Sequence, residues 1–418
     1  MKRVLCGNIV TTPKLGVLDC TERGCLVLED GRILGRFDHI PERFADAEIE
    51  DYGDALILPA FADLHLHAPQ YPMLGMGMDL PLLEWLNTYT FRTEARFRDP
   101  EYARKVYRIF AHRLIVNGTT RVAMFSSLHT DATLILMEEL ERAGVCGYVG
   151  KVNMDRNAPD YYIESTEESK RETLRWLKAC ERFTKVRPIL TPRFTPSCSD
   201  ELMRWLGDVA RDYDLPVQSH LSESLGEIAW VKELAPDCER YWETYAKAGL
   251  WKPGTLMAHC VYSDAVERKA MRDYGVTAVH CADSNINIAS GIAPVKQLLD
   301  EGNLVALGSD IAGGAQLSML EVIQMTIRTS KIKRIESNWT QDFLSVADGF
   351  WLGTTAGTSY FGAKPGFAEG EPLHAVVISD VHLPDADRLS LRERFERIVY
   401  LAKTGDIVAV YADGKRVR

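Results

Sequence analysis

The sequence lacks a cysteine framework. Its nine cysteines among 418 residues are an odd number at scattered positions, and no two of them are separated by two residues. The chain therefore has neither the Cys-x-x-Cys pairs of structural zinc sites and thiol redox motifs nor the even, closely spaced set of a disulfide-rich protein. We expect reduced cysteines and a cytoplasmic location.

An excess of basic residues is also absent. Lys and Arg number 49 against 59 Asp and Glu, which gives a formal net charge of −10. This balance excludes the positive footprint of a nucleic-acid-binding protein and a basic helix that lies on a membrane surface. No apolar run approaches the ~20 residues of a membrane span, and residues 1–10 do not read as a signal peptide. We expect a small-molecule partner, neutral or cationic, and neither nucleic acid nor membrane.

Turn residues between short apolar runs occupy both ends of the chain. Asp30-Gly31 near the N-terminus and Asp413-Gly414 near the C-terminus each separate two such runs. An Asp-Gly pair in this setting predicts a β-hairpin. Neither end can build a core alone, and chain ends often lie close together. We therefore expect residues 1–58 and 366–418 to form one small, composite β-sandwich.

Residues 59–365 alternate apolar runs of strand length with amphipathic stretches of helical length. This pattern predicts an α/β fold with a parallel sheet, and its number of repeats favours a (β/α)8 TIM barrel. A doubly wound open sheet is the alternative, although no G-x-G-x-x-G or Walker loop follows any predicted strand. The length alone would also accommodate two or three ordinary domains. The expected strands are residues 56–65, 119–125, 147–152, 187–191, 216–220, 255–259, 277–280 and 304–308, and the clearest expected helices are residues 169–183, 200–213 and 264–274.

Polar side chains stand at the ends of several predicted strands. His65 and His67 are two residues apart at the end of the first, so both point to the same face. His220 ends the fifth strand, His259 ends the sixth, and Asp310 follows the eighth. In a barrel all of these positions lie at the C-terminal mouth, where active sites are built. The sequence therefore predicts that these side chains converge.

Three histidines and one aspartate are a donor set typical of a catalytic metal centre. Imidazole nitrogen and carboxylate oxygen suit zinc, and also iron or manganese. With an open position for water, a bound ion lowers the pKa of that water to about 7 and supplies hydroxide at neutral pH. We expect His65, His67, His220 and Asp310 to hold one such ion.

The run Pro59-x-x-x-Asp63-x-His65-x-His67 resembles the signature of the amidohydrolase superfamily, and the likeness covers nearly the whole chain. Within the superfamily it is most similar to members that remove the amine from guanine. The segments that carry this finer resemblance are residues 67–72 (HAPQYP), 191–194 (TPRF), 219–223 (SHLSE), 258–259 (AH), 280–285 (HCADSN) and 307–314 (LGSDIAGG).

The resemblance implies roles in proton transfer. Glu223 would carry a proton from the attacking water to a ring nitrogen. His259 would hydrogen-bond that water or the tetrahedral intermediate. Asp310 would both bind the metal and help to deprotonate the water. A carboxylate near a cation in a dry pocket suits such a shuttle at neutral pH.

The resemblance also implies the substrate contacts. Gln70 and Arg193 would read the purine, with Arg193 donating to the carbonyl oxygen, and Phe194 would shape the pocket. His220 and Glu223 would also touch the substrate. A site that hydrogen-bonds a carbonyl rejects an analogue that lacks it, because its donor is left unpaired.

The resemblance thus implies hydrolysis of guanine at C2, giving xanthine and ammonia, by a homodimeric enzyme with one Zn²⁺ per subunit, for which Fe²⁺ is the alternative. A deaminase or dechlorinase of another heterocycle, such as 8-oxoguanine, a pterin or an s-triazine, is the alternative, and a non-catalytic scaffold is a remote one. Three residues depart from the family pattern, namely Ala60, Asp283 and Ser309. Of these, Asp283 is the departure that most affects which substrate is expected.

Lys151 is the nearest candidate for the bridging lysine of a second metal, and we expect a single ion.

Overall fold

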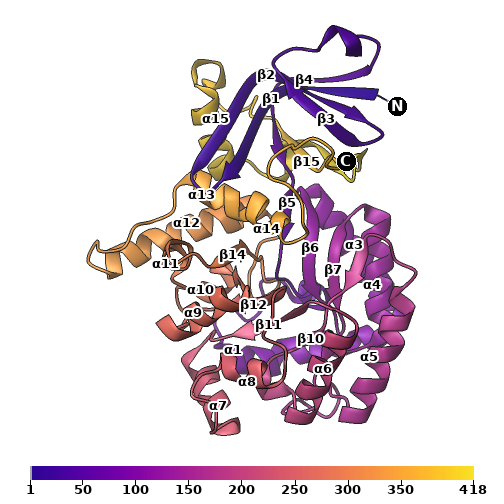
Figure 1. Ribbon diagram of the computed structural model, residues 1–418, viewed down its shortest axis with the longest axis vertical. Helices are drawn as coiled ribbons and strands as arrows, with labels where there is room; N and C mark the ends of the chain where they lie inside the picture. Colours follow the sequence, from indigo (N-terminus) through magenta and orange to yellow (C-terminus); the bar gives the residue numbers. More distant parts are fainter. Residues whose placement is uncertain (1) are drawn as a thin grey trace.

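The computed structural model describes residues 2–418 and has a smaller, strand-rich part above a larger α/β part (Figure 1). The smaller part is one seven-stranded sheet in the order β17-β16-β15-β4-β1-β2-β3. Both chain ends contribute to it, so the expected association of the termini is seen. Its strands are β1 (Lys2–Lys14), β2 (Val17–Glu29), β3 (Arg32–Phe37), β4 (Glu48–Pro59), β15 (Ala375–Ile378), β16 (Ile407–Ala412) and β17 (Lys415–Arg416).

The two predicted hairpins are both present in this sheet. Asp30 and Gly31 have φ angles of 49° and 81° and connect β2 to β3, which pair antiparallel. Asp413 and Gly414, with φ angles of 49° and 74°, connect β16 to β17 in the same way. Positive φ at both central positions is the requirement of the two-residue hairpin turn that matches strand twist, and Asp-Gly meets it at low cost.

The larger part is built on parallel strands. One four-stranded sheet has the order β5-β6-β7-β9, another has the order β11-β12-β13-β14, and β8 pairs with β10. A parallel bridge between Leu190 and Val217 lies between the first sheet and the second on one side. On the other side, Leu64 N donates to Leu307 O over 3.0 Å. The strands are β5 (Phe61–Asp63), β6 (Thr119–Phe125), β7 (Cys146–Gly150), β8 (Val152–Asn153), β9 (Val186–Pro188), β10 (Thr191–Pro192), β11 (Val217–Leu221), β12 (Thr255–His259), β13 (Thr277–His280) and β14 (Leu304–Leu307).

Helices follow most of these strands, and α3, α4 and α5 cover the outer side of β6 and β7 (Figure 1). The three clearest predicted helices are present as α5, α6 and α9. Ser165, Ser199 and Asp264 cap their N-termini by accepting backbone N–H groups, as expected of such residues. The helices are α1 (Leu82–Trp85), α2 (Phe91–Ala95), α3 (Pro100–Val116), α4 (Thr130–Ala143), α5 (Thr166–Cys180), α6 (Asp200–Asp212), α7 (Leu225–Leu234), α8 (Trp242–Lys247), α9 (Ala265–Tyr274), α10 (Ala282–Asn287), α11 (Val295–Asp300), α12 (Met319–Glu336), α13 (Val346–Trp351), α14 (Gly357–Ser359) and α15 (Leu391–Leu401).

The predicted strand over residues 56–65 is wrong in its extent. Residues up to Pro59 belong to β4 of the terminal sheet, and β5 begins only at Phe61. The chain leaves the terminal sheet after Ala60, whose N–H still donates to His374 O in register with the antiparallel pairing of β4 and β15. An unbroken apolar run conceals this change, because both halves are buried and therefore need the same kind of residue.

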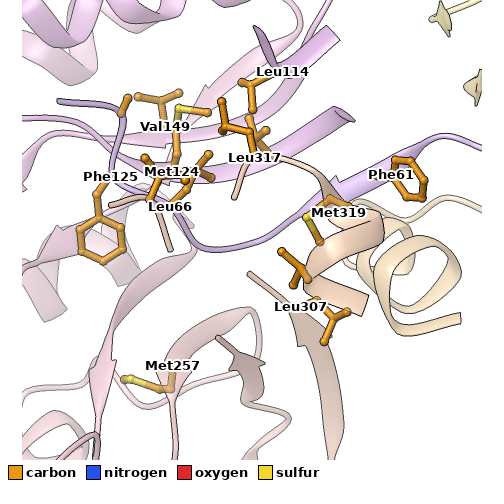
Figure 2. Packing of buried hydrophobic residues seen from close by; sticks show 14 of the residues in the cluster. Phe61, Leu66, Leu114, Met124, Phe125, Val149, Met257, Leu307, Leu317 and Met319 are labelled. Carbon is orange, nitrogen blue, oxygen red and sulfur yellow. The ribbon is translucent and has the colours of Figure 1, made fainter. Parts of the chain in front are cut away.

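The largest hydrophobic core lies between the strands and their helices. Leu66, Met124 and Val149 are fully buried and gather in it (Figure 2). None of the helices in residues 2–418 is both long and apolar enough to cross a bilayer. All nine cysteines are free, in agreement with the expected absence of a disulfide framework.

Candidate metal centre and active site

The structure brings the predicted ligand side chains together. His65 and His67 follow β5, His220 lies in β11, and Asp310 follows β14. His65 Nε2 lies 3.3 Å from Asp310 Oδ1, and His67 Nε2 lies 3.5 Å from the same oxygen. His67 Nε2 is 3.2 Å from His220 Nε2. These contacts make one compact cluster from three strands at the same end of the parallel sheets.

The three imidazoles of this cluster offer neutral nitrogen ligands. Burial lowers the pKa of His65, and it lowers the pKa values of His67 and His220 well below their usual range. His220 Nδ1 lies 2.6 Å from the backbone oxygen of Arg193. Since that oxygen only accepts, Nδ1 carries the hydrogen and Nε2 turns its lone pair toward the cluster.

The carboxylate of Asp310 completes the donor set. Burial opposes its ionisation, but the adjacent histidines, with His65 first, hold the pKa of Asp310 below its usual value. Asp310 also has a left-handed backbone, with φ of 50°, as does His259 with φ of 74°. Such strained conformations cluster at functional sites.

This donor set fits a divalent ion. The ligand atoms of His65, His67 and His220 lie within 4.8 Å of one another, as do those of His65, His259 and Asp310. Two nitrogens at about 2.1 Å from a tetrahedral ion stand about 3.4 Å apart, which is close to the His67–His220 separation. Neutral imidazoles with one carboxylate suit zinc or iron.

Glu223 and His259 lie beside the cluster. His259 Nε2 is 3.5 Å from Glu223 Oε2 and 3.7 Å from Asp310 Oδ2. Burial, followed by the charge of Asp310, raises the pKa of Glu223 to about 8, although Ser290 Oγ donates to Glu223 Oε1 over 3.2 Å. A carboxyl group of this kind exchanges a proton near neutral pH. Asn285 Oδ1 is 2.8 Å from His259 Nδ1 and so fixes the hydrogen on that nitrogen.

Glu227 is a buried acid that the sequence analysis did not single out. Its Oε2 accepts from the backbone N–H of Glu223 over 2.8 Å, and Tyr241 OH donates to its Oε1 over 2.8 Å. Ser224 and Glu227 form the capping box of α7. A Ser-x-x-Glu pattern is a readable sign of a helix start, so the signal for Glu227 was present. Its effect is to fix the backbone that carries Glu223.

A pocket opens beside the cluster, and the predicted substrate contacts line it. Gln70, Arg193 and Phe194 are all in its wall, together with His67, His220, Glu223, His259 and Asp310. Trp85 of α1 is buried and also lines the pocket. The other lining residues are Leu82, Leu86, Ser284, Ile288 and Gly313.

Gln70 and Arg193 share a partner that no motif marks, Glu94 in α2. Arg193 Nη1 donates to Glu94 Oε2 over 2.7 Å and Nη2 donates to Oε1 over 3.1 Å. Gln70 Nε2 donates to Glu94 Oε1 over 2.8 Å. Glu94 is 0% exposed. The sequence around it gives no sign that this carboxylate meets two residues of the pocket.

Two other residues raised by the sequence have structural partners. Lys151 Nζ is buried and lies 2.7 Å from Glu164 Oε2, so the lysine forms an ion pair with this glutamate. That arrangement favours a single ion over a bridged pair. Asp283 Oδ2 accepts from the backbone N–H of Ala315 over 2.7 Å and thereby holds the loop that contains Asp310.

Comparisons with known proteins identify the family of the chain. The chain matches the Amidohydrolase family over residues 56–417. It is 37% identical over 375 residues to the guanine deaminase of Mus musculus, covering 86% of this chain and 82% of that protein. It is 35% identical over 378 residues to the guanine deaminase of Dictyostelium discoideum, covering 88% and 84%. The crystal structure of guanine deaminase from C. acetobutylicum with bound guanine in the active site superimposes with a TM-score of 0.97 at 42% identity, over 100% of both chains.

Proposed function

This chain belongs to the amidohydrolase family, and we propose that it hydrolyses guanine to xanthine and ammonia. It is then a hydrolase that acts on a carbon–nitrogen bond of a cyclic amidine. The observation that carries the proposal is the placement of Arg193 and Gln70 in the wall of one pocket with Glu223 and the histidine cluster. The likeness to guanine deaminases over most of the chain supports the same substrate.

We infer that His65, His67, His220 and Asp310 hold one Zn²⁺ per subunit, for which Fe²⁺ is the alternative. When bound, the ion acts as a Lewis acid that makes water nucleophilic at neutral pH. The neutral imidazoles and the ionised carboxylate of this cluster are the protonation states that metal binding requires.

Proton transfer falls to Glu223, His259 and Asp310. Glu223 takes a proton from the attacking water and delivers it to a ring nitrogen, and a further proton leaves with the amine as ammonia. A C2–O bond forms and the C2–N bond breaks, so water and guanine give xanthine and ammonia. His259 Nε2, beside both carboxylates, hydrogen-bonds the attacking oxygen. Asp310 assists deprotonation of the water.

Recognition of the base falls to the other wall of the pocket. Arg193 donates to the carbonyl oxygen, Gln70 contacts the ring edge, and the ring of Phe194 forms an apolar side. His220 and Glu223 complete the substrate contacts. An analogue without the carbonyl leaves the guanidinium N–H that would bind it without an acceptor, and is rejected.

We also infer the architecture that carries the site. The contacts of Leu190 with Val217 and of Leu64 with Leu307 join the parallel sheets on both sides, which supports a closed (β/α)8 barrel over residues 59–365. Residues 1–58 and 366–418 then form a composite β-sandwich. A homodimer and a cytoplasmic location remain predictions.

An ultraviolet turnover assay on metal-analysed protein tests the function. Guanine should be the best substrate among guanine, 8-oxoguanine, adenine and cytosine, with ammonia and xanthine formed in equal amounts. If 8-oxoguanine or another heterocycle is turned over faster than guanine, the enzyme is a deaminase of that heterocycle instead. If protein loaded with zinc turns over none of these substrates, the result supports the alternative that the chain is a non-catalytic scaffold.

A further inference from the structure

Glu94 is a fully buried carboxylate that touches both residues proposed to read the base. Each of its oxygens accepts from the guanidinium of Arg193, and Oε1 also accepts from Gln70 Nε2. Arg193 and Gln70 are themselves 2% exposed. The three side chains therefore form one desolvated unit at the pocket wall, and the proton-transfer groups described above do not use Glu94.

Glu94 decides which way the amide of Gln70 faces. Gln70 Oε1 accepts from the backbone N–H of Ala312 over 3.0 Å, while Nε2 donates to Glu94. Turning the amide over would set Nε2 against an N–H and Oε1 against a carboxylate. Both contacts would be repulsive, so only one orientation satisfies the network. Gln70 therefore has one Nε2 hydrogen and one Oε1 lone pair left for a ligand, and both have fixed directions.

Glu94 also fixes the plane of the Arg193 guanidinium. A bidentate contact between a carboxylate and a guanidinium fixes the orientation of the guanidinium plane and also strengthens the ion pair. The Arg193 group lies over the ring of Phe91, 5.1 Å from its centroid. Two of its five N–H groups donate to Glu94, and Arg193 also lines the pocket. The negative charge of Glu94 offsets the buried positive charge, so the wall presents directed donors without net charge.

We propose that Glu94 is a positioning residue that sets the selectivity of the pocket for a ring carbonyl next to a ring N–H. The inference rests on the proposed function and extends it from the two reading residues to the group that aligns them. A neutral lactam edge matches a wall of directed donors with no net charge. An amino group in place of the carbonyl would set its hydrogens against the N–H groups of Arg193.

Binding of two ligands without the leaving amine tests this role separately from turnover. Hypoxanthine carries the ring carbonyl and adenine carries an amino group in its place. Calorimetric Kd values of zinc-loaded wild type should favour hypoxanthine by about 100-fold. In Glu94→Gln that ratio should fall to below about ten, because the guanidinium and the amide lose their common anchor. In Glu94→Asp, whose carboxylate cannot reach both partners, the ratio should fall by about tenfold.

Glu164→Gln is the matched control. Glu164 is a second buried acid paired with a buried cation, Lys151, and it does not line the pocket. If Glu94 had a purely structural role, its replacement would lower stability and weaken the binding of hypoxanthine and adenine equally. The Glu164→Gln control should show no larger effect than this. An unchanged hypoxanthine-to-adenine ratio in Glu94→Gln, or in Glu94→Asp if only that variant folds, overturns the proposal. Failure of wild type to bind hypoxanthine or to turn over guanine would instead contradict the proposed function.

Discussion

Nε2 of His67 lies 3.2 Å from Nε2 of His220, although the two residues are 153 positions apart in the chain. This separation matches one edge of a tetrahedron of ligands around a zinc-sized ion. The hydrogen of His220 is on the opposite nitrogen, where it meets the backbone oxygen of Arg193. The backbone that presents the base-reading guanidinium therefore also orients a metal ligand.

Replacement of His220 with Ala should remove the ion. The variant loses one of the four proposed ligands, and we expect metal content to fall from about one equivalent to below about 0.1 and kcat to fall by at least about 10³-fold. Because a ligand that binds only the folded state stabilises it, the rise in Tm on adding zinc should also be lost. Metal analysis and thermal unfolding measure both effects.

His280→Asn serves as the comparison for that variant. His280 is a buried histidine at the end of β13 that neither belongs to the ligand groups nor lines the pocket. It should keep one equivalent of metal. Full metal content in His220→Ala would contradict the ligand assignment.

Replacement of Glu223 with Gln should separate chemistry from metal binding. The amide cannot take up and release a proton, so kcat should fall by about 10³-fold while the metal content stays unchanged. Steady-state kinetics and metal analysis on the same sample check this. The kcat of Glu227→Gln should fall far less, since this change leaves the carboxyl group of Glu223 in place and perturbs only the contacts at the start of α7. Near-normal turnover in Glu223→Gln would mean that another group shuttles the proton.

The sequence predicted strand-end residues well because a local rule places them. His65, His67, His220 and Asp310 follow or end short apolar runs, and the carboxyl ends of parallel strands meet on one side of the sheet. Glu94 obeys no such rule. It meets Gln70 and Arg193 across 24 and 99 positions of sequence, and only the folded chain brings the three together. The break at Ala60 was missed for a related reason, since burial on both sides of it leaves no polar mark.

Ser284 should contribute to substrate binding. Its hydroxyl is buried, lines the pocket and has no hydrogen-bond partner among the described residues. A buried hydroxyl in this position is a ready partner for a ring atom. Ser284→Ala should therefore raise KM for guanine by up to about tenfold with little change in kcat or stability, because no internal hydrogen bond is lost.

Ser330→Ala provides the opposite case. The buried Ser330 hydroxyl donates to Ile327 O and accepts from Leu344 N, away from the pocket. This variant should lose about 1 kcal/mol of stability for each bond and keep its KM. An unchanged KM in Ser284→Ala would remove that residue from the substrate contacts.

His374 should make stability depend on pH through a site remote from the pocket. The backbone N–H of Asp413 donates to His374 Nε2 over 3.2 Å, and Nδ1 lies 2.9 Å from Thr120 Oγ1, so the neutral ring satisfies both contacts. Burial, followed by the charge of Arg121, lowers the pKa of His374 to about 3. Above the unfolded-state pKa of about 6.5 the ring is neutral in both states and adds no pH dependence.

Below that value the unfolded chain binds a proton that the folded protein does not. Stability should therefore fall with decreasing pH by about 1.4 kcal/mol per pH unit from this residue alone, until the folded-state pKa is reached. In His374→Gln this contribution disappears, and the amide oxygen still accepts from Asp413. Urea unfolding of metal-free wild type and variant between about pH 6.5 and pH 4.5 should give slopes that differ by one proton, since all other titrating groups are shared. Equal slopes would show that His374 is protonated in the folded protein.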